Sequence, residues 1–279
     1  MNVETMQYSI NVNGKLVTFE KPLVMGILNV TDDSFFSHSR VATARQIGQR
    51  AADMLAAGAD ILDVGACSTR PGGVLVGEGE ELQRLHLALD VLDKEFPGAL
   101  VSVDTFRGKV VSECAASHNV SIINDVSGYD WDSAMFDAIV SSGLPYVLTH
   151  SNGPAGTANG VPLQQVLTGL SAKMWQLRQS GVADIIVDPG FGFGKSLEQN
   201  YRMLDSLREF AVLDAPLLVG VSRKSMITRV LACSADEALV GTVALNAIAV
   251  DRGASILRVH DVKEAVQVVA VARALKGGF

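Results

Sequence analysis

The sequence alternates eight times between a short apolar segment and a longer segment with helical character. The apolar segments each end in polar residues and cover 23–29, 61–65, 100–104, 121–125, 145–150, 184–188, 217–221 and 255–260. Most are nearly continuous apolar runs, which is typical of parallel strands covered on both faces. Because helical crossovers bring the carboxyl ends of parallel strands to one face, we expect the functional residues at these ends.

The segments between the apolar runs have the pattern of helices. They lie near 42–57, 79–95, 106–117, 132–142, 162–180, 197–210, 235–251 and 262–275. This alternation over 279 residues predicts a single α/β domain, a (β/α)8 TIM barrel, for which about 250 residues is typical. We therefore treat residues 1–279 as one domain. A doubly wound open sheet shows the same alternation and is the alternative fold.

The first 20 residues follow a different pattern. Residues 9–19 alternate between polar and apolar side chains and contain the turn dipeptide Asn13-Gly14. This combination predicts a β-hairpin. We expect the hairpin to cap the amino-terminal end of the barrel.

Composition narrows the classes of protein. Hydrophobic residues make up 48% of the chain, but no apolar run reaches the ~20 residues of a membrane span. The start of the chain has no basic segment followed by an apolar one, so no secretory signal is expected. The 3 cysteines are too few and scattered for a disulfide framework, which favours the cytoplasm. A net charge of −7 gives no basic footprint for nucleic acid.

Basic residues gather at three of the predicted strand ends. They lie in 68–73 (Ser-Thr-Arg-Pro-Gly-Gly), in 222–225 (Ser-Arg-Lys-Ser) and in 258–260 (Arg-Val-His). Strand alternation puts Arg258 and His260 on the same side. Guanidinium groups fork oxyanions and lysine adds a point charge, so the convergence predicts a phosphate or pyrophosphate site. Each of these residues taken singly is equally consistent with a solvated loop charge.

A second group of residues at the strand ends carries carboxylates and amides. Its members are Asn29, Asp63, Asp104, Asn124, Asp125 and Asp188. Carboxylates inside a barrel pocket accept hydrogen bonds from a planar heterocycle rich in N–H groups. The alternative interpretation is that some of these residues cap the helices that follow. The two groups together predict a cavity with an acidic floor and a basic rim.

Seven of these segments resemble dihydropteroate synthase, in order, from about residue 22 to the end of the chain. The motifs are 27–35 (Ile-Leu-Asn-Val-Thr-Asp-Asp-Ser-Phe), 58–72 with its Asp-Val-Gly and Ser-Thr-Arg-Pro-Gly, 102–105 (Ser-Val-Asp-Thr), 123–128 (Ile-Asn-Asp-Val-Ser-Gly), 188–195 (Asp-Pro-Gly-Phe-Gly-Phe-Gly-Lys), 220–225 (Gly-Val-Ser-Arg-Lys-Ser) and 258–262 (Arg-Val-His-Asp-Val). Ordered agreement along the whole barrel is far more specific than any single motif.

The resemblance implies a pterin-binding barrel that condenses 6-hydroxymethyl-7,8-dihydropterin pyrophosphate with p-aminobenzoate in folate synthesis. The products are 7,8-dihydropteroate and pyrophosphate. It implies that the pterin is held by Asp104, Asn124, Asp188 and Lys224. A dissociative mechanism is implied, in which diphosphate leaves before the arylamine attacks.

The resemblance also assigns the other substrate groups. The diphosphate is expected at Arg258 and His260, and at Asn29 through Mg²⁺, a hard dication that suits an asparagine oxygen plus waters. The loops carrying Asp33, Thr69, Arg70 and Pro71 are expected to close over the substrates, and Phe193, Gly220, Ser222 and Lys224 to bind them, with Phe193, Ser222 and Lys224 lining the p-aminobenzoate slot. The catalytic residues are then Asp33, Arg70, Lys224, Arg258 and His260. By analogy alone, the chain is expected to form a homodimer and to be a sulfonamide target.

Four positions depart from the family's usual pattern. Asp32 replaces a proline and leaves its loop less constrained. Cys67 stands where glutamate is frequent and is read as a small packed side chain. Thr149 and Ser151 flank His150 where the family has methionines. A threonine and a serine predict a shorter and more polar wall beside the pterin ring, and His150 is read as structural.

Other functions were weighed against the synthase. Residues 190–196 have the wrong glycine spacing for a P-loop. Lys195 or Lys224 could form a Schiff base as in a barrel aldolase, but nothing else indicates a carbonyl substrate. A pterin-binding methyltransferase has no diphosphate to bind, which the basic cluster argues against. A non-catalytic pterin-binding paralogue is the third hypothesis, suggested by Asp32, Thr149 and Ser151.

Overall fold

The computed structural model describes residues 8–31, 40–67, 75–152, 161–275 and 277. The expectations for Asp32, Asp33, Thr69, Arg70 and Pro71 lie outside these residues. The rest of the predicted site falls inside them.

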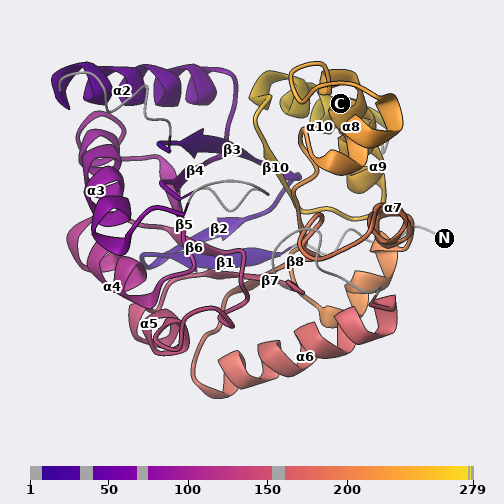
Figure 1. Cartoon of the computed structure of the whole chain (residues 1–279), viewed down its shortest axis with the longest axis horizontal. Coiled ribbons are helices and arrows are strands. Elements are labelled where there is room, and N and C mark those ends of the chain that lie inside the picture. Colours follow the sequence, from indigo (N-terminus) through magenta and orange to yellow (C-terminus); the bar gives the residue numbers. More distant parts are fainter. Residues whose placement is uncertain (1–7, 32–39, 68–74, 153–160, 276, 278–279) are drawn as a thin grey trace.

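The described residues contain eight parallel strands arranged around a central axis (Figure 1). They are β3 (Leu23–Asn29), β4 (Ile61–Gly65), β5 (Leu100–Asp104), β6 (Ile122–Asp125), β7 (Tyr146–Thr149), β8 (Ile185–Asp188), β9 (Leu218–Val219) and β10 (Ile256–Val259). Neighbouring strands pair in the order β8-β7-β6-β5-β4-β3-β10-β9. A parallel bridge between Val187 and Leu217 joins the two end strands. The sheet therefore closes on itself, so the barrel prediction is confirmed and the open sheet is wrong.

Helices surround the strands as an outer layer (Figure 1). They are α2 (Arg40–Ala56), α3 (Glu78–Glu95), α4 (Gly108–Ser117), α5 (Met135–Ser142), α6 (Leu163–Gln179), α7 (Leu197–Asp205), α8 (Ser225–Leu231), α9 (Leu239–Asp251) and α10 (Val262–Leu275), with a 3-10 helix η1 at Leu207–Leu213. Within the described part of the chain, none of the helices has the length and apolar character required to cross a membrane.

The interior of the barrel is built in layers because every second strand residue points inward. The lowest layer is apolar and consists of Met25, Ile61, Ile122, Val147, Ile186, Leu218 and Ile256, all buried in one cluster. Two residues further along their strands lie Asp63, Asn124, Thr149, Asp188 and Arg258. Two residues along each of these strands thus lead from an apolar layer at the bottom of the barrel to a polar layer nearer the carboxyl ends of the strands.

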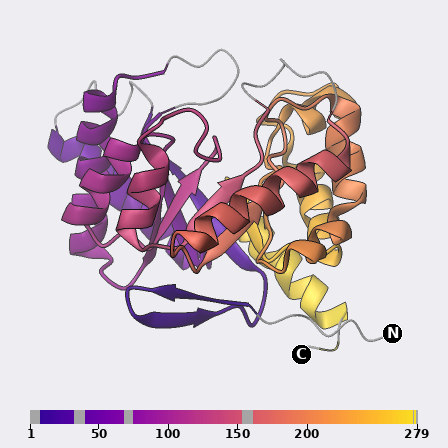
Figure 2. The same ribbon diagram turned by 90° about the horizontal axis from the view of Figure 1, so that it is seen from below.

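The hairpin seals the amino-terminal end of the barrel, as predicted. Strands β1 (Ser9–Val12) and β2 (Lys15–Thr18) pair antiparallel through the Asn13-Gly14 turn. Both turn residues have positive φ, 50° and 82°, which is the geometry that Asn-Gly favours. Ile10 joins the lowest apolar layer of the barrel. Figure 2 shows the hairpin lying across the bottom of the strands.

The region after β9 differs from the prediction. The strand was expected over 217–221 but ends at Val219, and the predicted helix at 235–251 begins at Leu239. Between them lies α8, which the sequence pattern did not indicate. The chain turns after Val221, where the Lys224 backbone N–H donates to the Val221 carbonyl, and Arg223 takes φ 55°. The buried Met226 and Ile227 then anchor α8 against the core.

Candidate active site

Arg258 binds two carboxylates of the predicted acidic floor. Its Nε donates to Asp63 Oδ2 at 2.7 Å and its Nη2 to Asp104 Oδ2 at 2.5 Å. Asp63 is fully buried, and the side chains of Asp104 and Arg258 are 16% and 19% exposed. Burial alone lowers the pKa of Arg258, but the two carboxylates outweigh it and hold the pKa above its ordinary value. The guanidinium stays charged in the cavity.

Asp104 lies near several other carboxylates, among them Asp63, with Arg258 as the opposing cation. Burial raises the pKa of Asp104 to about 7, with Arg258 opposing the shift and Asp63 adding to it. Asn124 donates from Nδ2 to both oxygens of Asp63, at 3.3 and 3.1 Å. Asp63 is therefore bound by both Asn124 and Arg258, and the contacts join three polar groups on β6, β4 and β10, between which β5 and β3 intervene.

Asp188 and Lys224 form a second polar pair in the cavity. Asp188 Oδ1 accepts the Gly190 backbone N–H at 2.7 Å, and burial raises the pKa of Asp188. Burial lowers the pKa of Lys224 to about 8, and Asp188 opposes that shift. The Lys224 ammonium donates to the Phe191 carbonyl and lies 4.8 Å from the centre of the Phe193 ring.

Ser222 and His260 lie together at the ends of β9 and β10. The Ser222 hydroxyl is 3.0 Å from His260 Nδ1 and accepts the His260 backbone N–H at 3.2 Å. Gly220 lies beneath them, and a Cβ atom there would come within 3.9 Å of both the Arg258 side chain and the Lys224 ammonium. The missing side chain leaves room between these two cations.

The comparisons with known proteins agree with this geometry. Residues 25–260 match the model of the pterin binding enzyme family. A dihydropteroate synthase of Escherichia coli (strain K12) is 39% identical over 268 residues, covering 94% of each chain. That of Bacillus subtilis (strain 168) is 37% identical and covers 93% of this chain and 91% of its own.

Solved structures lead to the same result. Dihydropteroate synthase of Yersinia pestis, in complex with a sulfonamide drug, superposes with a TM-score of 0.87 at 34% identity over 98% of this chain and 100% of its own. The Xanthomonas albilineans synthase with 4-aminobenzoic acid gives 0.88 at 32% identity over 97% and 98%. The chain belongs to the dihydropteroate synthase family of pterin-binding enzymes.

Membership of the dihydropteroate synthase family confirms the predicted activity in folate biosynthesis. It also decides against the methyltransferase, because these full-length relatives are synthases. The acidic and basic groups that the sequence predicted at the strand ends lie close together: Arg258 bonds to Asp104, and Asp188 and Lys224 are within electrostatic reach of Arg258.

Two predicted charges belong to structure rather than to the site. Asp125 accepts the Ser127 backbone N–H and hydroxyl, the Tyr129 backbone N–H and the Tyr146 hydroxyl, so it holds the turn after β6. Arg223 forks Asp261, with Nε–Oδ2 and Nη2–Oδ1 distances of 3.0 and 2.6 Å. The cluster after β9 therefore supplies Lys224 to the cavity, while the Arg223 charge is neutralised beside it.

Glu81 lies with Glu78 and Glu80 in the acidic first turn of α3. Its side chain is fully buried, accepts the Thr105 hydroxyl at 2.6 Å and pairs with Arg107. Arg107 also donates to the Val76 carbonyl at 2.8 Å. No sequence signal distinguished Glu81 from its neighbours, because its partners lie more than twenty residues away in the chain.

Thr149 confirms the expectation of a polar wall at the end of β7. It is 1% exposed, and its hydroxyl has no hydrogen-bond partner among the described residues. It pairs in register with Asp188 on β8. His150 lies at the end of β7, its Nδ1 is buried without a hydrogen-bond partner among the described residues, and burial lowers its pKa to about 4.

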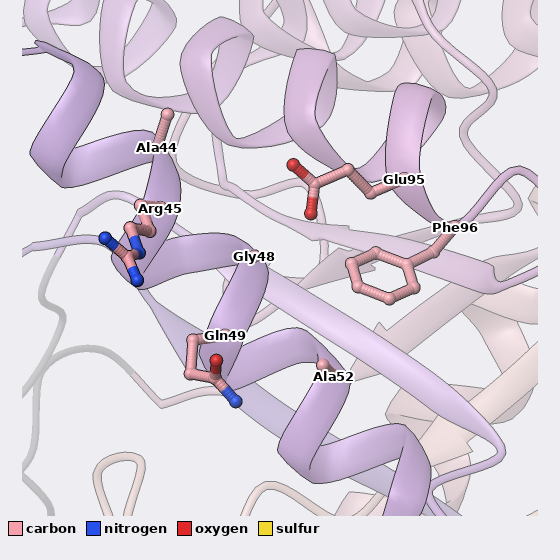
Figure 3. Close-up of a pocket in the computed structure, with 7 residues that line it drawn as sticks. All are labelled: Ala44, Arg45, Gly48, Gln49, Ala52, Glu95 and Phe96. Atoms are coloured by element: carbon pink, nitrogen blue, oxygen red, sulfur yellow. The ribbon is translucent and has the colours of Figure 1, made fainter.

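A hollow outside the barrel contains none of the predicted site residues. It lies between α2 and the end of α3 and is lined by Ala44, Arg45, Gly48, Gln49, Ala52, Glu95 and Phe96 (Figure 3). Its polar groups are Arg45, Gln49 and Glu95, which do not converge on a common point in Figure 3. The predicted site residues that the structure describes lie instead at the carboxyl ends of the strands.

Proposed function

We propose that this chain performs its synthase reaction by dissociative substitution, with pterin on the acidic floor and diphosphate on the basic rim. The observation that supports this most is the direct contact of Arg258 with Asp104. A group that binds an anion and a group that binds ring donors then share one cavity. The methylene carbon between the ring and the diphosphate then lies between the carboxylates of the floor and the cations of the rim.

The pterin ring is assigned to Asp104, Asn124, Asp188 and Lys224. Two carboxylates suit the amino and ring N–H donors of a pterin, because ionised carboxylates are acceptors only. The lysine supplies a donor for a ring acceptor. The same carboxylates stabilise positive charge that develops on the ring as the C–O bond breaks.

The diphosphate is assigned to Arg258 and His260. Arginine has five N–H donors, and the bonds to Asp63 and Asp104 use only part of them. A charged fork anchored by two carboxylates is already oriented when the leaving group develops negative charge. Such preorganised donors stabilise a departing anion strongly in a site that excludes water.

Magnesium and Asn29 complete the leaving-group site. Asn29 ends β3 on the inward face, since it follows Met25 by four residues. The described residues contain no cluster of three or more histidine, cysteine or acidic side chains that could hold a metal. One asparagine oxygen therefore fits a dication held mainly by diphosphate oxygens and waters. When bound, the ion would neutralise charge on the leaving diphosphate.

The arylamine is assigned to the slot beside Lys224, Phe193, Ser222 and Gly220. The ammonium lies over the Phe193 ring, so an aromatic carboxylate has both a ring face and a cation to bind. Asp33, Thr69, Arg70 and Pro71 are proposed to close over this slot and to exclude water. Water would otherwise capture the dihydropterin cation.

A homodimer is proposed on the basis of an apolar outer face. Helices α9 and α10 pack against each other, and their outward residues include Val240 at 78% exposure, Ile248, Val271 and Leu275. Exposed apolar side chains on two helices that pack together suit an association surface. Light scattering of the purified protein tests the dimer.

A reducing cytoplasmic location is also proposed, and the three free cysteines agree with it.

Incubation with dihydropterin pyrophosphate, p-aminobenzoate and Mg²⁺ tests the proposed function. Dihydropteroate and pyrophosphate should form in equal amounts, and a chelator should stop both. Pterin binding without either product would contradict the proposal. If the products form equally well with the chelator present, only the role proposed for Mg²⁺ is contradicted.

A further inference from the structure

Lys195 holds the loop after β8 by three hydrogen bonds. Its ammonium donates to the carbonyls of His150 at 2.9 Å, Gly190 at 2.8 Å and Phe193 at 3.2 Å. An ammonium has three N–H donors, so its donors are all committed to backbone. Lys195 therefore has none left for a substrate.

The loop that Lys195 holds, residues 189–194, lies directly against the end of β7. Gly190 and Gly194 have φ of 71° and 61°. A Cβ on Gly190 would lie 2.0 Å from the His150 carbonyl oxygen, and one on Gly194 would lie 2.7 Å from Asn152 Cβ. The glycines allow this close approach, but they also lower the loop's own rigidity. Its shape depends on the groups that bind its carbonyls.

Two lysines donate hydrogen bonds to backbone carbonyls of this loop. Lys195 binds those of Gly190 and Phe193, and Lys224 binds that of Phe191 between them. Lys224 is assigned to the substrates, so its bond to Phe191 is available for exchange when they bind. Lys195 is then the cation that keeps the loop in place during turnover.

A second brace comes from below the loop. Asn200 on α7, which is 3% exposed, accepts the Gly192 backbone N–H at 2.7 Å and donates to the Ser196 carbonyl at 2.7 Å. It acts on Gly192 and on the start of α7, whereas Lys195 donates to the His150 carbonyl at the end of β7. Removal of Lys195 therefore takes away a hydrogen bond between this loop and the end of β7 that Asn200 does not replace.

We propose that Lys195 is a positioning residue that sets the Phe193 wall of the arylamine slot without touching either substrate. This inference rests on the proposed function of the same cavity. Phe193 lies five residues beyond the anchored Asp188, so its displacement should affect the arylamine before the pterin. Burial and the nearby Lys224 lower the pKa of Lys195 to about 7, with Asp188 opposing the shift, so its environment disfavours the charged form that a surface lysine keeps.

The test compares Lys195→Met with Lys173→Met. Lys173 is a matched control because its ammonium also braces a loop, donating to the Gly128 carbonyl at 2.7 Å and pairing with Asp130. We expect Lys195→Met to raise the KM for p-aminobenzoate about tenfold, since small misplacements at a reacting pair are costly. The KM for dihydropterin pyrophosphate should change less than about threefold, and Lys173→Met should change neither by that much.

Lys195→Arg keeps the inference testable if Lys195→Met fails to fold. A planar guanidinium keeps the charge but cannot point three donors at the same carbonyls. It should give an intermediate rise in the KM for p-aminobenzoate and faster hydrogen exchange in 190–194, with 122–129 unchanged. Equal KM values for wild type and both Lys195 variants would overturn the inference, and so would equal rises for both substrates. Wild-type protein that makes no dihydropteroate would instead count against the proposed function.

Discussion

The guanidinium of Arg258 contacts the carboxylate of Asp104 across the barrel, with an Nη2–Oδ2 distance of 2.5 Å. The two residues come from β10 and β5, which are separated by β3 and β4 in the sheet. Asp63 on β4 bridges the gap by binding the same guanidinium at 2.7 Å. Arg258, which is proposed to bind the leaving diphosphate, is thus held in place by carboxylates of the proposed pterin site. A change to the arginine or to these carboxylates affects both.

Replacement of Arg258 should affect chemistry more than pterin affinity. In Arg258→Ala, kcat should fall by about 10²- to 10³-fold, which is typical when a preorganised charge donor is lost. Affinity for a pterin lacking diphosphate, measured by calorimetry, should fall much less. Loss of the cation also leaves Asp63 and Asp104 unpaired, so a lower melting temperature is expected. Equal losses of kcat and of pterin affinity would contradict the leaving-group role.

Activity should depend on pH through two buried groups. Asp104, with its pKa raised to about 7 by burial, is protonated below that pH and loses acceptor capacity for the ring donors. Lys224, with its pKa lowered to about 8 by burial, loses its charge above that pH. We expect a narrow bell in a plot of kcat/KM against pH, falling on both sides of about 7 to 8.

Lys224→Arg is the control for the alkaline limb. An arginine does not deprotonate in this range, so the alkaline fall should disappear while the acid limb stays. A wild-type profile that is flat from pH 6 to 9 would mean that neither group titrates in the working enzyme.

The unpaired hydroxyl of Thr149 should serve the pterin ring. Thr149→Val keeps the shape and removes the hydroxyl, and we expect the KM for the pterin substrate to rise about three- to tenfold, the value of one hydrogen bond. The melting temperature should not fall, because no described residue loses a partner. Thr149→Ser should retain affinity. A lower melting temperature with an unchanged KM would show that the hydroxyl acts in folding instead.

The hairpin should contribute to stability and not to catalysis. Ile10 is 1% exposed within the lowest apolar layer. Ile10→Ala should lower the free energy of unfolding by about 2–5 kcal/mol, with kcat unchanged. Leu16 lies on the same hairpin but is 70% exposed, so Leu16→Ala should have little effect in chemical denaturation. Similar losses for the two variants would contradict the capping role.

Periodicity predicted the parts of the structure that depend on local pattern. The barrel, the hairpin and the shared face of Arg258 and His260 follow from alternation and from the Asn-Gly turn. The cavity was also predictable as a meeting of strand ends. These features need no knowledge of which side chain binds which.

Partnerships between distant residues could not be predicted in the same way. Nothing local indicates that Arg258 would bind Asp63, 195 positions away, or that Arg223 would be neutralised by Asp261. Nothing local distinguishes Glu81 from the other two acidic residues of its helix turn, because its partner Thr105 is 24 positions distant. The short helix α8 was missed because its seven residues are held by burial of Met226 and Ile227 rather than by helical periodicity.

Positional isotope exchange in dihydropterin pyrophosphate tests the central claim most directly. The substrate carries ¹⁸O in the oxygen that bridges the methylene carbon and phosphorus, and is incubated with the enzyme and Mg²⁺ without p-aminobenzoate. If the C–O bond breaks before the arylamine arrives, the label should scramble into non-bridging positions, and Arg258→Ala should abolish the scrambling. Label that stays in the bridge in an enzyme that turns over normally would contradict the dissociative account.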